Sequence, residues 1–207
     1  GIIRGERPNE LSLYLQAMKR NGMELEFISR EAYKRKESPE FLKMLQTQFG
    51  KSRIIPEGGA GNLGVQGAME MVHANEPFNY VFLPGATATT LGGIALKLQN
   101  SSTRVGCVQV LKGESILRNE LVRGTGIDLN SLPHVDVFEQ FHFGGYAKTT
   151  AELIEFQLDW EVKTGIPLDL VYGAKAMFGL LQLAKDGYFA RSSKVLFVHT
   201  GGLGPGI

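Results

Sequence analysis

The sequence has 207 residues, of which 43% are hydrophobic and 21% are charged, values typical of a globular chain with a sizeable core. Its 22 Lys and Arg residues balance 21 Asp and Glu residues, and no basic run is present, so nothing favours a nucleic-acid partner. No apolar stretch reaches the roughly 18 residues of a membrane span, and the first residues lack a signal-peptide layout. We therefore expect a cytoplasmic protein that binds neither nucleic acid nor a membrane.

The reactive side chains form no recognisable catalytic or metal-binding pattern by themselves. The single cysteine, Cys107, excludes an internal disulfide and lies in an apolar run at residues 105–110, which predicts a buried core thiol rather than a nucleophile. The four histidines are scattered, with no Cys or Glu at ligand spacing. We therefore expect no metal site.

Apolar runs of strand length alternate with segments of helical periodicity along the chain. Residues 1–5 are typical of the end of a strand followed by a turn, which suggests that an N-terminal segment is missing from this sequence. Further strands are predicted at residues 24–29, 52–55, 80–83, 104–111, 135–141 and 194–199. Helices are predicted at residues 9–20 (with Asn9 as the N-cap), 39–49, 87–98, 114–123, 149–164 and 173–184, and from the glycine-rich segment 57–67 to residue 74.

This alternation predicts an α/β fold with an open, mostly parallel sheet and helices on both of its faces. The composition changes near residues 50–56, from charged and helical to glycine-rich and apolar. We therefore expect part of a small α/β domain at residues 1–52 and a larger domain at residues 53–207.

The segment from Tyr80 to Thr90 passes from a strand through Gly85 into the start of a helix that is rich in hydroxyl groups. Backbone N–H groups at a helix start lack intrahelical partners, and the helix dipole adds partial positive charge there. Such a start is a site for phosphate, and Thr87, Thr89 and Thr90 offer further hydrogen-bond donors. The segment also follows the carboxyl end of a strand, where open α/β sheets bind ligands. An ordinary capped turn is the other interpretation.

Three further segments have the composition of ligand sites, although each also fits a packed turn. The glycines of residues 56–67 allow close approach of the backbone to a ligand or to another segment. Tyr172, which precedes Gly173, can stack on a flat ring and exchange a proton if its pKa is lowered. Thr200 follows the last strand and can hydrogen-bond a heteroaromatic nitrogen. Lys175 is interpreted as a solvated lysine on a helix face.

The order of these segments resembles one enzyme family. The stretches that carry the resemblance are IIPEGGAGNLGVQG (54–67), LPGATATTLGG (83–93), FGGYAK (143–148), VYGAKAMFGL (171–180) and LFVHTGG (196–202). Together they resemble the fold-type-II pyridoxal-phosphate (PLP) enzymes of the D-cysteine desulfhydrase and 1-aminocyclopropane-1-carboxylate (ACC) deaminase family. The opening GIIRGE (1–6) is similar to the interior of that family's smaller domain.

The resemblance implies a bound PLP and assigns roles to single residues. Tyr172 matches an active-site tyrosine beside the cofactor ring, and Thr200 matches the residue that hydrogen-bonds the pyridine nitrogen in the desulfhydrase branch. The phosphate loop implied by the resemblance consists of Leu83, Pro84, Gly85, Ala86 and Thr87, with the backbone of Gly85 and Ala86 and the Thr87 side chain as donors.

The deaminase branch has a Glu directly after the tyrosine, and Gly173 takes that position here. The resemblance therefore favours a desulfhydrase-like β-elimination from a small amino acid, which yields pyruvate, ammonia and sulfide, over an ACC deaminase-like reaction. A homodimer is a further expectation from the family. The family's Schiff-base lysine and its Ser-Asn-His segment come from an N-terminal region without a counterpart here, and Lys175 is not given that role. The alternatives are a non-catalytic remnant that binds the PLP phosphate or another phosphorylated ligand, and an unrelated nucleotide-binding domain.

Overall fold

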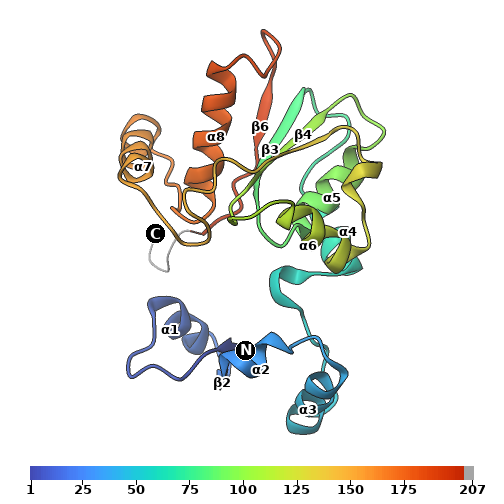
Figure 1. The fold of residues 1–207 in the computed structure, drawn as a ribbon, viewed down its shortest axis with the longest axis vertical. Helices are drawn as coiled ribbons and strands as arrows, with labels where there is room; N and C mark the ends of the chain where they lie inside the picture. The colour runs from blue at the N-terminus through green and yellow to red at the C-terminus, as the bar shows by residue number, and fades with distance from the viewer. Residues whose placement is uncertain (203–207) are drawn as a thin grey trace. The chain divides into compact units, whose positions relative to one another are not determined.

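The computed structural model describes residues 1–202, which divide into two compact units after Ile54. The first unit, Gly1–Ile54, has a pair of short parallel strands and three helices among its described residues (Figure 1). These are β1 (Ile2–Arg4), β2 (Glu26–Ile28), α1 (Leu13–Arg20), α2 (Arg30–Lys34) and α3 (Pro39–Phe49). The domain limits expected at residues 52 and 53 stay a prediction.

A serine stands directly before each helix of the first unit and accepts a backbone hydrogen bond from its first turn. The Ser38 hydroxyl, for example, accepts from the N–H of Phe41 at 3.2 Å, as expected of an N-cap. Ser12 has this role in α1, so the prediction that Asn9 caps a longer helix is wrong. The strand expected at residues 52–55 is also wrong, because no neighbouring strand pairs with it.

The larger unit, from Ile55 onward, contains a four-stranded sheet in the order β5-β4-β3-β6 among the described residues, and every pairing in it is parallel. This confirms the predicted open parallel sheet. Its strands are β3 (Tyr80–Gly85), β4 (Arg104–Gln109), β5 (Val135–Phe138) and β6 (Val195–Phe197). Its helices are α4 (Asn62–Met69), α5 (Thr89–Leu98), α6 (Ile116–Thr125), α7 (Ala151–Thr164) and α8 (Gly173–Lys185), with single 3₁₀ turns η1 (Glu57–Gly59) and η2 (Leu129–Ser131).

Alternate side chains of the central strand face different helical layers, as the two-residue period of a strand requires. Val81 and Leu83 pack with residues of α5 and α6, whereas Phe82 packs with Ala176 of α8. Figure 1 shows α5 and α6 on one side of the sheet and α8, with α7 beside it, on the other. Cys107 is fully buried in the first of these layers, which confirms the core thiol, and its burial raises the pKa of that thiol.

Helix ends in the larger unit differ from the predicted ones for local reasons. The helix α5 begins at Thr89 rather than at residue 87, because Ala88 takes a left-handed conformation with φ of 62°. The helix α4 ends at Met69 rather than at residue 74. Just after this end, the N–H of Met71 bonds to the carbonyl oxygen of Ala68, three residues back instead of four, which tightens the last turn. No helix formed by residues 1–202 combines the length and apolar character that crossing a bilayer requires.

Helices α4 and α5 approach each other so closely that glycine is required between them. A Cβ atom added to Gly93 would lie 2.5 Å from both the Cβ of Ala68 and the carbonyl oxygen of Val65. Backbone atoms cannot yield as a flexible side chain can, so a methyl group at this position forces the helices apart. This contact fixes the glycine-rich segment, which leads into α4, beside the helix that follows β3.

A pair of glycine substitutions tests this contact. We expect Gly93→Ala to destabilise the protein by about 1–3 kcal/mol through overpacking. The matched control is Gly67→Ala on α4, where an added Cβ meets nothing within 4 Å, and helix propensity predicts a gain of roughly 0.5–1 kcal/mol. Urea unfolding of both variants measures the difference, and an equal response of the two would contradict the close packing.

Candidate functional site

The loops that follow the parallel strands meet at one edge of the sheet. All four strands of the larger unit point the same way, so the segments at residues 86–88, 110–115, 139–150 and 198–202 share this edge. The helices α5 and α8 also begin here: α5 directly follows β3, and the start of α8 contacts the loop after β5. The structure therefore brings the predicted phosphate loop, Tyr172 and Thr200 to the same edge.

The predicted phosphate loop is shaped by the core beneath it. A Cβ atom on Gly85 would lie 2.6 Å from the sulfur of Cys107 and 2.9 Å from a methyl carbon of Leu117, so only glycine fits at the end of β3. The left-handed Ala88 then turns the chain into α5, and no side chain caps this helix. The N–H groups of the first helical turn are left without an intrahelical or capping acceptor, and they supply the donors that a phosphate group needs.

The threonines of this loop have different environments. Thr87 is partly buried, and its side chain packs against Gly58 of η1. Thr89 is only 4% exposed, and its buried Oγ1 has no hydrogen-bond partner among the described residues. An unpaired buried hydroxyl costs about 1–3 kcal/mol, so an acceptor at this position would be stabilising. The backbone donors at the start of α5 therefore fit a phosphate group, and Thr89, one of the three threonines expected as donors, has a hydroxyl available for such a group.

A carboxylate that the sequence analysis did not single out organises the start of α8. Asp169 Oδ1 accepts the N–H groups of Val171 at 2.9 Å and Tyr172 at 2.7 Å, and its Oδ2 accepts the N–H of Gly173 at 2.8 Å. Negative charge is favourable at a helix start, both as a cap and through the helix dipole. The acidic residue shortly before the predicted helix is the signal that could have identified this cap.

Asp169 also connects the start of α8 to the segment after β6. A Cβ atom on Gly202 would lie 2.7 Å from the Asp169 carboxyl carbon, so the backbone at Gly202 is in contact with this side chain. Nearby, a ring nitrogen of His199 lies 2.9 Å from the Pro167 carbonyl oxygen. Thr200 lies between these two anchored residues, is exposed, and forms no hydrogen bond within residues 1–202.

Tyr172 is half-buried at the N-cap position of α8. Its ring packs edge-on against Tyr146, with the ring centroids 6.1 Å apart. Burial raises the pKa of Tyr172, and a hydrogen bond with the Tyr146 side chain raises it further. The lowered pKa considered in the sequence analysis is therefore wrong for this structure. A hydroxyl with a raised pKa keeps its proton at neutral pH, so Tyr172 is suited to donate a hydrogen bond.

The interpretation of Lys175 as a solvated residue is also wrong. Its side chain is fully buried, and Nζ donates a hydrogen bond to the carbonyl oxygen of Gly145 at 2.7 Å. Desolvation lowers the pKa of Lys175, against the opposing effect of the Asp169 carboxylate. The sequence showed the helix but not that this face of it is covered by the loop after β5.

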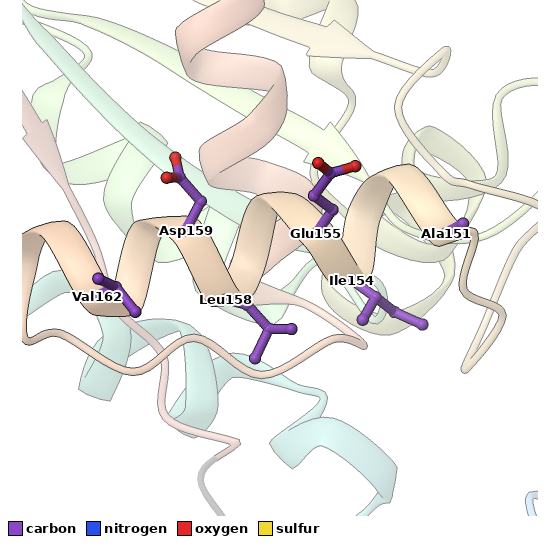
Figure 2. A pocket seen from close by; sticks show the side chains of 6 residues that line it. All are labelled: Ala151, Ile154, Glu155, Leu158, Asp159 and Val162. Carbon is purple, nitrogen blue, oxygen red and sulfur yellow. The ribbon is translucent and has the colours of Figure 1, made fainter.

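A shallow hollow on the protein surface lies elsewhere, along the outer side of α7 (Figure 2). Leu158 and Val162 are 56% and 87% exposed on this side of the helix. The residues that line the hollow are Ala151, Ile154, Glu155, Leu158, Asp159 and Val162. None of the predicted site residues is among them, so the hollow does not contribute to the site at the sheet edge.

The larger unit has a parallel sheet with an uncapped helix start, suited to phosphate, at its carboxyl edge. This arrangement is typical of cofactor-binding α/β domains. A family model described as "Pyridoxal-phosphate dependent enzyme" matches residues 15–201 of the chain. The chain therefore belongs to this family of PLP-dependent enzymes, and the resemblance identified from the sequence motifs is confirmed.

Proteins similar to this chain carry the names of both branches of the family. A "Putative 1-aminocyclopropane-1-carboxylate deaminase" of Pyrococcus furiosus is 31% identical over 81% of this chain and 55% of its own length. A mitochondrial "Bifunctional D-cysteine desulfhydrase/1-aminocyclopropane-1-carboxylate deaminase" of Arabidopsis thaliana is 29% identical over 88% of the chain and 50% of its own length. The crystal structure of an ACC deaminase homologue superimposes with a TM-score of 0.75 at 28% identity, covering 98% of this chain and 65% of that one. The chain thus spans about half the length of these curated relatives.

The cap at the start of α8 can be tested by removing its acceptors. We expect Asp169→Ala to lower the free energy of unfolding by about 1–2 kcal/mol, because several N–H groups lose their acceptor. Asp169→Asn keeps one acceptor oxygen, so its free energy of unfolding should fall by less. Asp159→Ala on α7, which breaks an exposed ion pair with Lys163, serves as the control and should change stability by less than about 0.5 kcal/mol. Thermal unfolding followed by circular dichroism measures all three, and an equally small loss in Asp169→Ala would contradict the capping role.

Proposed function

We propose that the intact protein is a PLP-dependent lyase or deaminase that acts on a small amino acid by D-cysteine desulfhydrase-like β-elimination. The observation that carries this proposal is the uncapped start of α5 with its buried, unpartnered Thr89 hydroxyl, at the same edge as Tyr172 and Thr200. Membership of the PLP-dependent family supports PLP as the phosphate-bearing ligand at this edge.

The loop from Leu83 to Thr87 and the first turn of α5 would hold the cofactor phosphate. Its backbone donors and the positive end of the helix dipole attract a dianion, and Thr89 would add a side-chain donor. When bound, PLP supplies an electron sink for negative charge that develops at the substrate Cα. The protein supplies binding, orientation and proton transfer around it.

Tyr172 and Thr200 would have different roles toward the cofactor. Tyr172 keeps its proton because its pKa is raised, so it can serve as a donor beside the ring. Thr200 is exposed and free to turn its hydroxyl toward the pyridine nitrogen. A neutral hydroxyl partner leaves that nitrogen without a proton and weakens the electron sink. Together with Gly173 in place of an acidic residue, this supports β-elimination over ring opening of ACC.

The Schiff-base lysine is expected from a part of the protein outside residues 1–207. Lys175 is unsuited to this role because its Nζ is buried and bonded to Gly145. A homodimer, as in the sequence-based expectation, is part of the same proposal. The alternative is a protein that binds PLP or another phosphorylated ligand through this loop without turnover, since phosphate binding requires only the start of α5.

Turnover separates the two proposals. The intact protein supplied with PLP is expected to release pyruvate from D-cysteine or from 3-chloroalanine, or 2-oxobutyrate from ACC, measured by reduction of the keto acid with lactate dehydrogenase. It is also expected to show a yellow Schiff-base band that borohydride bleaches. If none of the three compounds yields its keto acid, the proposed activity is wrong. A colourless protein that still binds PLP would support the non-catalytic alternative.

The role of Thr89 can be tested without turnover. Thr89→Val preserves the shape of the side chain but removes the hydroxyl, and we expect it to weaken PLP binding by roughly 10-fold or more, the effect of a hydrogen bond to a charged group. Folding stability should not fall, because the hydroxyl that is removed has no partner in the free protein. Calorimetric titration with PLP and with inorganic phosphate measures the affinity.

Thr103→Val provides the matched control for this substitution. Thr103 is also buried, but its hydroxyl donates to the Phe78 carbonyl oxygen at 2.9 Å, near the start of β4 and far along the strands from the phosphate loop. This variant should lose stability and retain PLP affinity. Unchanged PLP affinity in Thr89→Val would show that its hydroxyl is not a phosphate ligand.

A further inference from the structure

Lys175 occupies an unfavourable position for a charged side chain. It is fully buried, and it lies in the first turn of α8, where the helix dipole disfavours positive charge. Taking an ammonium group out of water is costly even when one hydrogen bond is formed. A methionine of similar length would fill the same space without this cost. The presence of a buried amino group at this position therefore indicates that Lys175 does more than fill the core.

The acceptor of Lys175 lies in a turn with unusual backbone conformations. Phe143, Gly144 and Gly145 follow one another with φ of 50°, 90° and 111°, and Ala147 has φ of 54°. Such conformations persist only where surrounding contacts determine them. Residues of the loop after β4 support the turn from one side, since a Cβ atom on Gly145 would lie 3.1 Å from the Cβ of Lys112. The Lys175 Nζ also contacts this turn, through its hydrogen bond to the Gly145 carbonyl oxygen at 2.7 Å.

Tyr146, the residue that follows Gly145, connects this turn back to the start of α8, so that the contacts form a closed ring. Tyr146 is 58% exposed, and its ring meets the ring of Tyr172, which lies at the start of the same helix that carries Lys175. The path runs from Tyr172 along the first turn of α8 to Lys175, through the hydrogen bond to Gly145, and back through Tyr146 to Tyr172. An exposed tyrosine has many accessible orientations, and this closed ring of contacts restricts them.

We propose that Lys175 is a positioning residue that holds, through the Gly145 carbonyl, the turn that places Tyr146 against Tyr172. The lysine does not touch the reacting atoms in this scheme. It restricts the position of the Tyr172 ring, because the Tyr146 ring packs edge-on against it. The catalytic importance of the tyrosine pair rests on the proposed function, whereas the positioning itself can be measured in the protein without cofactor.

The test uses the chain labelled with 3-fluorotyrosine and ¹⁹F NMR, with the Tyr146 and Tyr172 resonances assigned through Tyr146→Phe and Tyr172→Phe. Lys175→Met is expected to move both resonances most of the way toward their values in the unfolded chain, while circular dichroism still reports a folded protein. Lys175→Arg, which keeps a charged donor, is expected to retain the native shifts. Lys148→Met removes an exposed lysine of the same turn and should leave both resonances in place.

A double-mutant comparison tests whether Lys175 acts through Tyr146. Once Tyr146→Ala has removed the ring that packs on Tyr172, adding Lys175→Met should shift the Tyr172 resonance much less than it does in the parent protein. Equal shifts in the two backgrounds would overturn the proposed route.

The remaining outcomes are equally decisive. If Lys175→Met does not fold, Lys175→Gln, whose shorter side chain ends before Gly145, takes its place with the same expected shift. A folded Met or Gln variant with native tyrosine resonances would refute the proposal, and so would an equal shift in Lys148→Met. If neither variant folds, Lys175 serves the fold itself and the positioning role is rejected. None of these results depends on PLP binding or on turnover, so they stand apart from any failure of the proposed function.

Discussion

The parallel pairing of β3 with β4 is the constraint on which the rest of the larger unit depends. It sets Gly85 opposite Gln109 at the carboxyl ends of the two strands. The fully buried Gln109 then holds the next loop, with its amide donating to the Leu111 and Gly113 carbonyl oxygens and its oxygen accepting the N–H of Leu117. Through this register, the loops after neighbouring strands are fixed beside each other before any ligand is present.

Much of this architecture could be predicted from the sequence, because the strands are continuous apolar runs and the helices carry periodic apolar faces. The order of the motifs also predicted the PLP-dependent family, which the family match confirms. The errors fall where a long-range contact overrides the local pattern. Lys175 has the surroundings of an exposed helix residue in the sequence, yet its acceptor, Gly145, is supplied by a loop thirty positions earlier. The cap formed by Asp169 was missed, although the acidic residue before the helix is a local signal.

Several departures from ordinary packing lie at the edge that carries the candidate site. Here the protein has an unpartnered buried hydroxyl at Thr89, a buried cation at Lys175 and several residues with positive φ. Each lowers stability by itself, and such departures from the usual rules are expected at functional sites rather than in the supporting core. At the opposite end of the strands, Asp136 accepts hydrogen bonds from Arg104 and Tyr188.

The contact between Gly85 and the Cys107 sulfur divides the phosphate loop into a part that can vary and a part that cannot. At Gly85 the backbone contacts the core, and any side chain larger than hydrogen would displace Cys107 of β4 and Leu117 of α6. Beyond it, Ala86 and Thr87 are only partly buried, so their side chains can change without disturbing the core. Substitutions that alter the surface of this loop without disturbing the core are therefore limited to the positions after Gly85, while the packing of the sheet fixes where the loop begins.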